Sequence, residues 1–247
     1  MFHHHAVIRI LLVFLAGVVC AAGGFELPEA SNQCVVGVTK GWNSSDVSLT
    51  TYEKKGGKWV KVAGPWQGKV GKSGLVWGLG ISPRPKDATI KTEGDNRAPA
   101  GVFRIGGAWG YDATIKKAAD LPYRQVTARD LWVEDPASPS YNQHLVIDHD
   151  PVTAWEKKQQ MKQGDYAHSI KLFIAHNAPP QAKAGAGSAI FFHIWRGEGS
   201  KPTAGCTTMP EDQLRGMIKW VDPKKQPVYV LLPDSEYAAK RDAWKLP

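Results

Sequence analysis

Residues 188–195 form a short apolar run rich in Ile, Phe and Trp, with a glycine close by on either side. This composition predicts a β-strand. Successive side chains of a strand face opposite sides of a sheet, and both sides of this run carry apolar residues. We therefore predict a central strand that is covered on both faces. His193 shares one face with Phe191 and Trp195, whereas Ile190, Phe192 and Ile194 lie on the other.

Similar apolar or alternating runs predict strands at 33–40, 47–54, 58–62, 89–92, 102–105, 144–148, 170–176 and 227–232. Glycine-rich segments predict loops and short strands over residues 64–80 and a turn over 106–111. Residues 153–162 predict a short helix. A second helix is predicted to begin at Pro210, because acidic residues follow at once and an i, i+3, i+4, i+7 stripe comes next: Leu214, Met217, Ile218 and Val221. The pattern is typical of a mainly β domain with a few helices.

The N-terminus has the pattern of an export signal. Arg9 precedes an unbroken apolar run over residues 10–19, and small residues follow it. We predict a secretory signal peptide over residues 1–22 that is cleaved near Ala22. Its apolar run is too short to span a membrane readily. Residues 23–247 are predicted to form a single domain. A lipidated Cys20 fits less well because Val19 precedes it, and an uncleaved anchor is the other alternative. Each version places the domain outside the cytoplasm, in the periplasm or cell envelope.

Charge and ligand-type residues exclude several classes of partner. The net charge is +8, but no run of five or more basic residues occurs, so nucleic acid is not an expected partner. An anionic cell-wall polymer fits the predicted location outside the cytoplasm better. Three of the eight histidines lie in the leader, and the adjacent residues 148–150 cannot all converge from one strand. Neither His-Glu-x-x-His nor paired Cys-x-x-Cys occurs, so we expect no metal and no cofactor. The oligomeric state is left open.

Cys206 and His193 are the candidate reactive pair. A nearby imidazole or helix N-terminus activates a thiol, and Cys206 lies just upstream of the helix predicted at Pro210. Gly205 allows a tight turn that could aim backbone N–H groups at an oxyanion. The simpler interpretation is an unrelated buried cysteine and a core histidine. Since a disulfide to Cys34 would consume the nucleophile, we predict a free thiol at Cys206.

Two segments resemble a known family. Gly-Ser-Ala-Ile-Phe-Phe-His-Ile at 187–194, followed by Pro-Thr-Ala-Gly-Cys at 202–206, resembles the signature of the YkuD-type L,D-transpeptidase catalytic domain, as in its ErfK/YbiS/YcfS/YnhG-like members. Residues 91–103 resemble the same family's Gly-Asp…Pro-x-Gly-x-Phe segment, and both motifs occur in the family's order. The resemblance covers residues 34–232. In the family the loop over 93–101 lies near the catalytic cleft, although Asp95 and Arg97 could equally be polar surface residues.

The resemblance implies a β-sandwich-like catalytic fold and a reaction on peptidoglycan stem peptides. Cys206 would attack the carbonyl of the third, L-linked residue of a tetrapeptide, release the terminal D-Ala and form a thioester. An amine from a second stem would then give a 3→3 cross-link. His193 would act as general acid and base, and the N–H groups of Gly205 and Cys206 would hold the oxyanion. Thr203 and Thr207 are the candidate substrate contacts, and a backbone carbonyl would suffice to orient His193.

Two positions depart from the family pattern. Ala204 stands where many members have His, and Thr208 stands where many have Arg or Asn. The acyl acceptor is therefore open: a second stem, a protein amine or water. An L,D-carboxypeptidase or murein hydrolase with the same Cys–His pair is one alternative, and a non-catalytic wall-binding protein is another.

Overall fold

The computed structural model describes residues 24–247. The predicted signal peptide lies outside the described residues. The strands are β1 (Gln33–Thr39), β2 (Asp46–Lys55), β3 (Lys58–Lys69), β4 (Leu75–Trp77), β5 (Ala98–Gly110), β6 (Tyr123–Gln125), β7 (Asp130–Trp132), β8 (His144–Val146), β9 (Ile170–Ile174), β10 (Phe191–Ile194), β11 (Thr207–Met209) and β12 (Val228–Pro233). The helices are α1 (Ala154–Gln159), α2 (Glu211–Trp220) and α3 (Asp234–Lys240), with 3-10 turns η1 (Tyr166–His168), η2 (Gly197–Gly199) and η3 (Pro223–Lys225).

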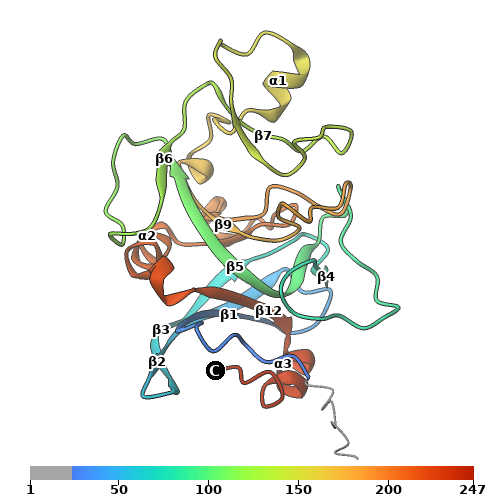
Figure 1. Ribbon diagram of the computed structural model, residues 1–247, viewed down its shortest axis with the longest axis vertical. Helices are drawn as coiled ribbons and strands as arrows, with labels where there is room; N and C mark the ends of the chain where they lie inside the picture. The colour runs from blue at the N-terminus through green and yellow to red at the C-terminus, as the bar shows by residue number, and fades with distance from the viewer. Residues whose placement is uncertain (1–23) are drawn as a thin grey trace, which may run out of the picture.

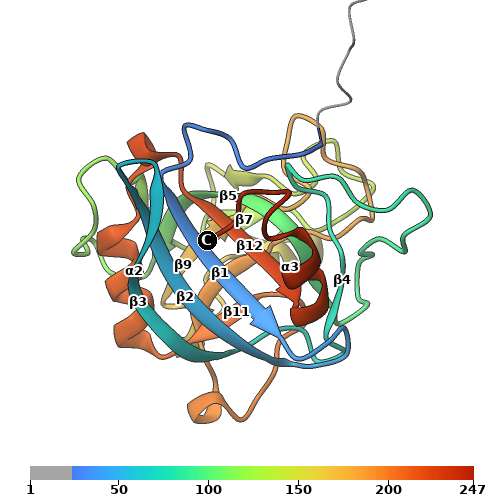
Figure 2. The same cartoon turned by 90° about the horizontal axis from the view of Figure 1, so that it is seen from below.

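Most strands of the described chain belong to one sheet, which closes on itself. Its order is β12-β1-β2-β3-β11-β10-β9-β5-β4, with β6 also pairing β5. The path becomes a ring because β12 pairs β5 on its other side, with Tyr229 opposite Phe103. The curved β1, β2 and β3 form one wall of this barrel, and α2 lies against its side (Figures 1 and 2). The prediction of a mainly β domain with a few helices is confirmed. The sheet that is expected to be sandwich-like closes into a barrel.

The apolar stripe of α2 packs into the barrel core. Leu214, Met217 and Ile218 are each no more than 1% exposed and join the main cluster of buried side chains. Burying one such side chain contributes roughly 1.5–3 kcal/mol. The first turn carries Glu211 and Asp212, which suit the positive end of the helix. The helix predicted after Pro210 is confirmed.

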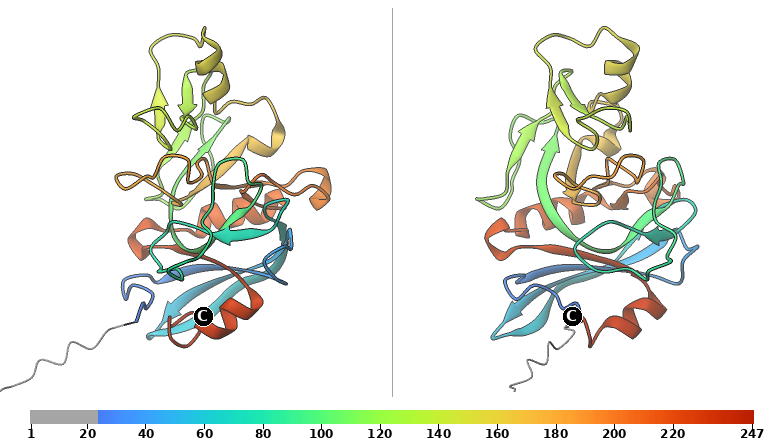
Figure 3. Two further views of the ribbon diagram at one scale, coloured as in Figure 1. Left: turned by 90° about the vertical axis from the view of Figure 1, so that its right-hand side faces the viewer. Right: turned by 45° about the vertical axis from the view of Figure 1, so that its right-hand side comes forward.

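A smaller lobe stands on the barrel at the end opposite α3 and the C-terminus (Figure 3). It contains the β7–β8 hairpin and α1. Buried Asp130 anchors it by accepting hydrogen bonds from Thr127 Oγ1 at 2.7 Å and His144 Nε2 at 2.7 Å and by pairing with Arg124. Burial alone would raise the pKa of Asp130, but these hydrogen bonds outweigh it and hold the pKa at about 2. Thr153 caps α1 through a reciprocal hydrogen-bond pair with Glu156.

Several of the predicted strand and turn boundaries are wrong. Residues 106–111 were predicted as a turn, yet β5 continues through them to Gly110. A Cβ at Gly106 would lie 2.9 Å from Cδ1 of Phe173. Glycine at this position therefore leaves room for the Phe173 ring without interrupting the strand. Likewise β3 continues to Lys69, well beyond the predicted 58–62. Residues 89–92 form no strand, and only a bridge between Ile90 and Trp77 remains. No helix among the described residues has the length and apolar composition needed to cross a bilayer.

Candidate active site

Cys206 lies in the loop between η2 and β11, and its thiol contacts the chain just before β10. The Sγ atom donates to the carbonyl oxygen of Ala189 at 3.4 Å and accepts from the backbone N–H of Phe191 at 3.4 Å. Parallel pairing of β10 with β11 sets Thr207 opposite Phe192, which places the preceding residue beside the start of β10. The sheet register therefore fixes the position of the thiol.

Thr203 holds the cysteine loop in shape. Its Oγ1 donates to the carbonyl oxygen of Cys206 at 2.6 Å and accepts from the N–H of Gly205 at 3.0 Å. Its backbone N–H donates to Val70 at 2.9 Å, which ties the loop to the end of β3. A Cβ at Gly205 would lie 3.1 Å from the carbonyl oxygen of Arg97, so a larger residue here would crowd the β4–β5 loop.

His193 is a buried, neutral base in this site. Its Nδ1 lies 2.8 Å from the carbonyl oxygen of Ile194. Because a carbonyl can only accept, Nδ1 carries the proton and Nε2 keeps its lone pair. Burial lowers the pKa of His193 to about 4, so the ring is uncharged at neutral pH. The orienting group that the sequence did not name is thus a backbone carbonyl.

Cys206 and His193 line the same cleft, which has a volume of about 370 Å³. Among the described residues no hydrogen bond joins the two side chains, since the thiol is engaged by Ala189 and Phe191. Burial raises the pKa of the Cys206 thiol, so this arrangement holds a protonated, resting nucleophile. Other polar and charged side chains of the cleft include Lys91, Glu93, Glu134, His168, Ser188 and Arg196.

The sequence profile of the YkuD family, the L,D-transpeptidase catalytic domain, matches residues 49–230. The chain belongs to this family. The matched part of the YkuD domain runs from β2 to β12 and includes every residue of the cleft.

Among solved structures, the YkuD domain resembles the helical cell shape determining protein Pgp2 from Campylobacter jejuni. The two share 16% identity with a TM-score of 0.38 over 82% of this chain and 48% of Pgp2. A mutant of Pgp2 gives 16% identity and a TM-score of 0.36 over 82% and 47%. The chain thus spans about half the length of these proteins. No curated protein sequence matches it.

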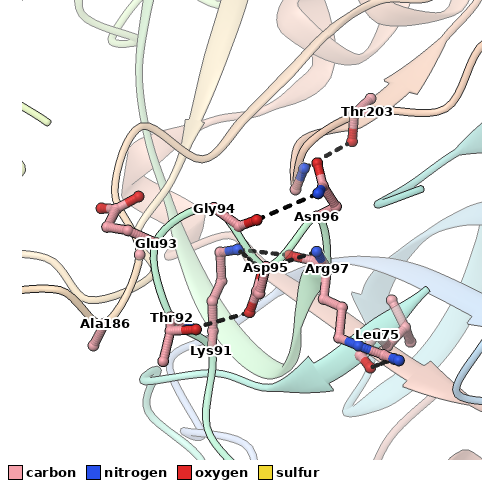
Figure 4. Close-up of polar contacts among 12 residues, drawn as sticks. Leu75, Lys91, Thr92, Glu93, Gly94, Asp95, Asn96, Arg97, Ala186 and Thr203 are labelled. Carbon is pink, nitrogen blue, oxygen red and sulfur yellow. Dashed lines mark hydrogen bonds and ion pairs between the residues drawn. The ribbon is translucent and has the colours of Figure 1, made fainter. Parts of the chain in front are cut away.

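The loop between β4 and β5 of the YkuD domain forms one wall of the cleft. Lys91, only 3% exposed, donates from Nζ to Asp95 Oδ1 at 2.7 Å and to the carbonyl oxygen of Arg97 at 2.7 Å (Figure 4). Asp95 also accepts from the N–H of Thr92 at 3.0 Å, and Arg97 donates to the carbonyl oxygen of Leu75 at 2.8 Å. Asp95 and Arg97 are therefore structural supports of the wall. Lys91 lines the cleft itself.

The other predicted site residues separate into two groups. Thr203, Ala204 and Gly205 line the cleft beside Cys206. Thr207 does not: it is 1% exposed, and its hydroxyl lies 3.0 Å from Tyr229 Oη in the core. The structure therefore places Thr207 away from the predicted substrate contact, because alternation along β11 turns it inward. Thr208 is buried too and hydrogen-bonds to Lys69.

A short strand separates Cys206 from the helix N-terminus that is expected to act on the thiol. Thr207–Met209 form a strand, and α2 begins only at Glu211. The field of a helix end fades within its first turn, so α2 has little effect on Cys206. The predicted free thiol is confirmed, because Cys34 and Cys206 are both unpaired and Cys34 is fully buried on β1.

Sequence reasoning missed two side chains that shape this site. His168 of η1 stacks on His193. Asn142 accepts from the N–H of Ala189 at 3.0 Å and so fixes the backbone whose carbonyl receives the thiol. Both residues come from segments that are distant in sequence from Cys206. Asn142 also has an unusual positive φ of 56°.

Residues 24–247 contain no group of three or more His, Cys, Asp or Glu side chains that could hold a metal ion. In the 148–150 segment, His149 instead contacts Asp148 at 2.8 Å and Glu156 at 2.9 Å on the surface.

Proposed function

We propose that this protein is an exported cysteine L,D-transpeptidase that acts on tetrapeptide stems of peptidoglycan. The observation that carries the proposal is that Cys206 and the unprotonated Nε2 of His193 belong to one cleft in a domain of the YkuD family. The predicted signal peptide supports a location in the periplasm or cell envelope. Residues 23–247 would then form the mature single domain.

The first half of the reaction forms a thioester. For this step the Cys206 side chain must turn from Ala189 toward His193, whose Nε2 then takes the thiol proton. The sulfur attacks the carbonyl carbon of the third stem residue, and the carbonyl oxygen becomes an oxyanion. The N–H groups of Gly205 and Cys206 would stabilise it. The N–H of Gly205 must exchange its present partner, Thr203 Oγ1, for this oxyanion. His193 then returns the proton to the amine of the departing D-Ala.

The second half transfers the acyl group. An amine of a second stem attacks the thioester carbon and loses a proton to Nε2 of His193. The carbon–sulfur bond breaks, the thiol recovers its proton, and a 3→3 cross-link remains. Water in place of the amine gives a tripeptide.

One observation favours hydrolysis as a second candidate. Ala204 is exposed at the cleft and offers no polar group to hold an acceptor. Thr208, the other departure from the family pattern, is only 1% exposed and does not line the cleft. An L,D-carboxypeptidase would need no acceptor group at either position.

The test is incubation of the purified protein with tetrapeptide-containing murein, followed by mass spectrometry of the products. Cross-linked dimers identify a transpeptidase, and tripeptides alone identify a carboxypeptidase. The Cys206→Ala variant should give neither product, because the covalent route is lost. Cys34→Ala is the matched control, since it removes the other, fully buried thiol and should keep turnover. Products that persist in Cys206→Ala would contradict the proposal.

A carbapenem gives an independent readout. The wild-type protein and Cys34→Ala should gain one covalent adduct at Cys206, and Cys206→Ala should gain none. An unmodified wild-type protein that also leaves murein unchanged would favour the non-catalytic alternative.

A further inference from the structure

Lys171 is a buried cation that the reaction above does not use. It lies on β9 directly opposite His193 of β10 and is only 3% exposed. Its Nζ donates to the carbonyl oxygen of Met161 at 3.0 Å, and no carboxylate among residues 24–247 lies within ion-pair distance of it. Burying an ammonium with a single hydrogen bond is costly, so a nearby compensating charge is expected.

A small hollow lies between Lys171 and the two residues that hold the thiol. Its volume is about 50 Å³, and its lining includes Lys171, Ala189 and Phe191. Ala189 and Phe191 are the two residues whose backbones hydrogen-bond to Cys206 Sγ. The Nζ of Lys171 also lies 5.6 Å from the centroid of the Phe191 ring. The hollow shares four lining residues with the catalytic cleft, namely Glu134, Gln163, His168 and Ala189.

The other basic groups facing the thiol are uncharged or already paired with a carboxylate. Burial keeps His193 and His168 uncharged at neutral pH, because their pKa values fall to about 4 and about 3. Lys91 is paired with Asp95 at 2.7 Å, and Arg196 with Asp165 at 2.5 Å. The charge of Glu134, whose own pKa is raised by burial, acts against a thiolate. Lys91 lowers the pKa of Cys206 less than Lys171 does, so Lys171 is the cation without a carboxylate partner that acts most strongly on the sulfur among the described residues.

The effect on the thiol has a definite sign. Burial raises the pKa of Cys206, whereas the N–H of Phe191 and the charge of Lys171 lower it. Burial lowers the pKa of Lys171 to about 8, and the charges of a Cys206 thiolate, Glu134 and Asp165 act in the opposite direction. The ammonium thus stays mostly charged at pH 7 while it remains close to its titration range.

We propose that Lys171 is a positioning residue that acts through Cys206: its ammonium, which lines a hollow with the two residues that hold the thiol, stabilises the thiolate while His193 remains neutral and accepts the proton. This inference rests on the proposed role of Cys206 as the nucleophile. The positive charge that stabilises the thiolate then comes from Lys171 of β9 rather than from a protonated histidine.

The test is the rate at which iodoacetamide alkylates Cys206 as a function of pH, followed by peptide mass spectrometry. Lys171→Met and Lys171→Gln should move the midpoint of the profile up by about one pH unit and slow alkylation roughly tenfold below it. Lys171→Arg keeps the charge and should stay near wild type. Lys162→Met, at an exposed lysine beside Met161, is the matched control and should not move the profile. A merely structural role would change the unfolding midpoint without shifting the pH profile.

A second measurement needs no substitution. Alkylation of wild-type Cys206 with iodoacetate adds a negative carboxylate, whereas iodoacetamide adds a neutral amide of similar size. Lysine Cε carbon NMR should give Lys171 a higher pKa in the first adduct than in the second, by about one unit. Equal values in the two adducts, or unshifted profiles in folded Lys171→Met and Lys171→Gln, would overturn the inference. Neither measurement requires turnover, so murein left unchanged beside a shifted alkylation profile would count against the proposed function alone.

Discussion

The imidazoles of His168 and His193 stack, with ring centroids 4.4 Å apart and 24° between their planes. His168 comes from η1 and covers the ring that β10 supplies. The stack is one reason why solvent does not reach His193, which is 2% exposed. It keeps the base neutral, and this neutrality has measurable consequences.

Turnover should extend to unusually low pH. A base works while it is unprotonated, and the pKa of His193 is lowered to about 4. In the pH profile of kcat/KM on a tetrapeptide substrate, the acid limb should therefore have its midpoint well below the pKa of an ordinary histidine. His168→Ala should open the ring to water and move the limb upward. His168→Phe keeps a stacked ring and should leave the limb low. Identical limbs in both variants would show that the stack does not set this pKa.

Loss of the base should affect chemistry more than folding. His193→Gln should reduce kcat/KM by about 100- to 10,000-fold, the usual contribution of a general base. His176→Gln is the matched control, because His176 is also fully buried but hydrogen-bonds to the carbonyl oxygen of Ala186 outside the cleft. This control should lower the urea midpoint while turnover per folded molecule stays near wild type. Equal losses of turnover in the two variants would argue against a specific role for His193.

Removing the partner of Lys91 should destabilise the cleft wall. The Lys91 and Asp95 side chains are 4% and 17% exposed, so Asp95→Asn leaves a buried ammonium without its carboxylate. We expect a loss of about 3 kcal/mol in the free energy of unfolding, measured by urea denaturation. Asp46→Asn breaks the surface pair with Lys69, where Asp46 is 65% exposed, and should cost less than about 1 kcal/mol. Similar losses in the two variants would contradict a special role for the Lys91 contact.

Acid should destabilise the fold through its buried histidines. The pKa values of His176 and His193 are lowered to about 4, below the ordinary value of 6.5, mainly by burial. Between these values the unfolded chain binds more protons, so stability is full above pH 6.5 and is lost as pH falls toward 4. Each histidine contributes on the order of 3 kcal/mol to this loss. Urea midpoints at several pH values should fall through this window, and His176→Gln should make the fall shallower.

The sequence allowed the centre of the site to be predicted because its parts are local. The apolar run around His193, the turn at Gly205 and the stripe of α2 are each determined by neighbours along the chain. The strand around His193 is indeed internal to the sheet, between β9 and β11.

The rest of the site depends on distant pairings. Asn142, His168 and Lys171 come to the site only through the hairpin lobe, η1 and the register of β9 against β10. No periodic pattern marks such residues. Thr207 shows the converse: it lies next to Cys206 in sequence, but the pleat of β11 turns it into the core.

The contact between His193 and Ile194 also bears on how this enzyme family can vary. The group that aligns the base is the main chain of the following residue, and every amino acid supplies that oxygen. Mutational drift at position 194 can therefore change size or shape without erasing the tautomer on which proton transfer depends.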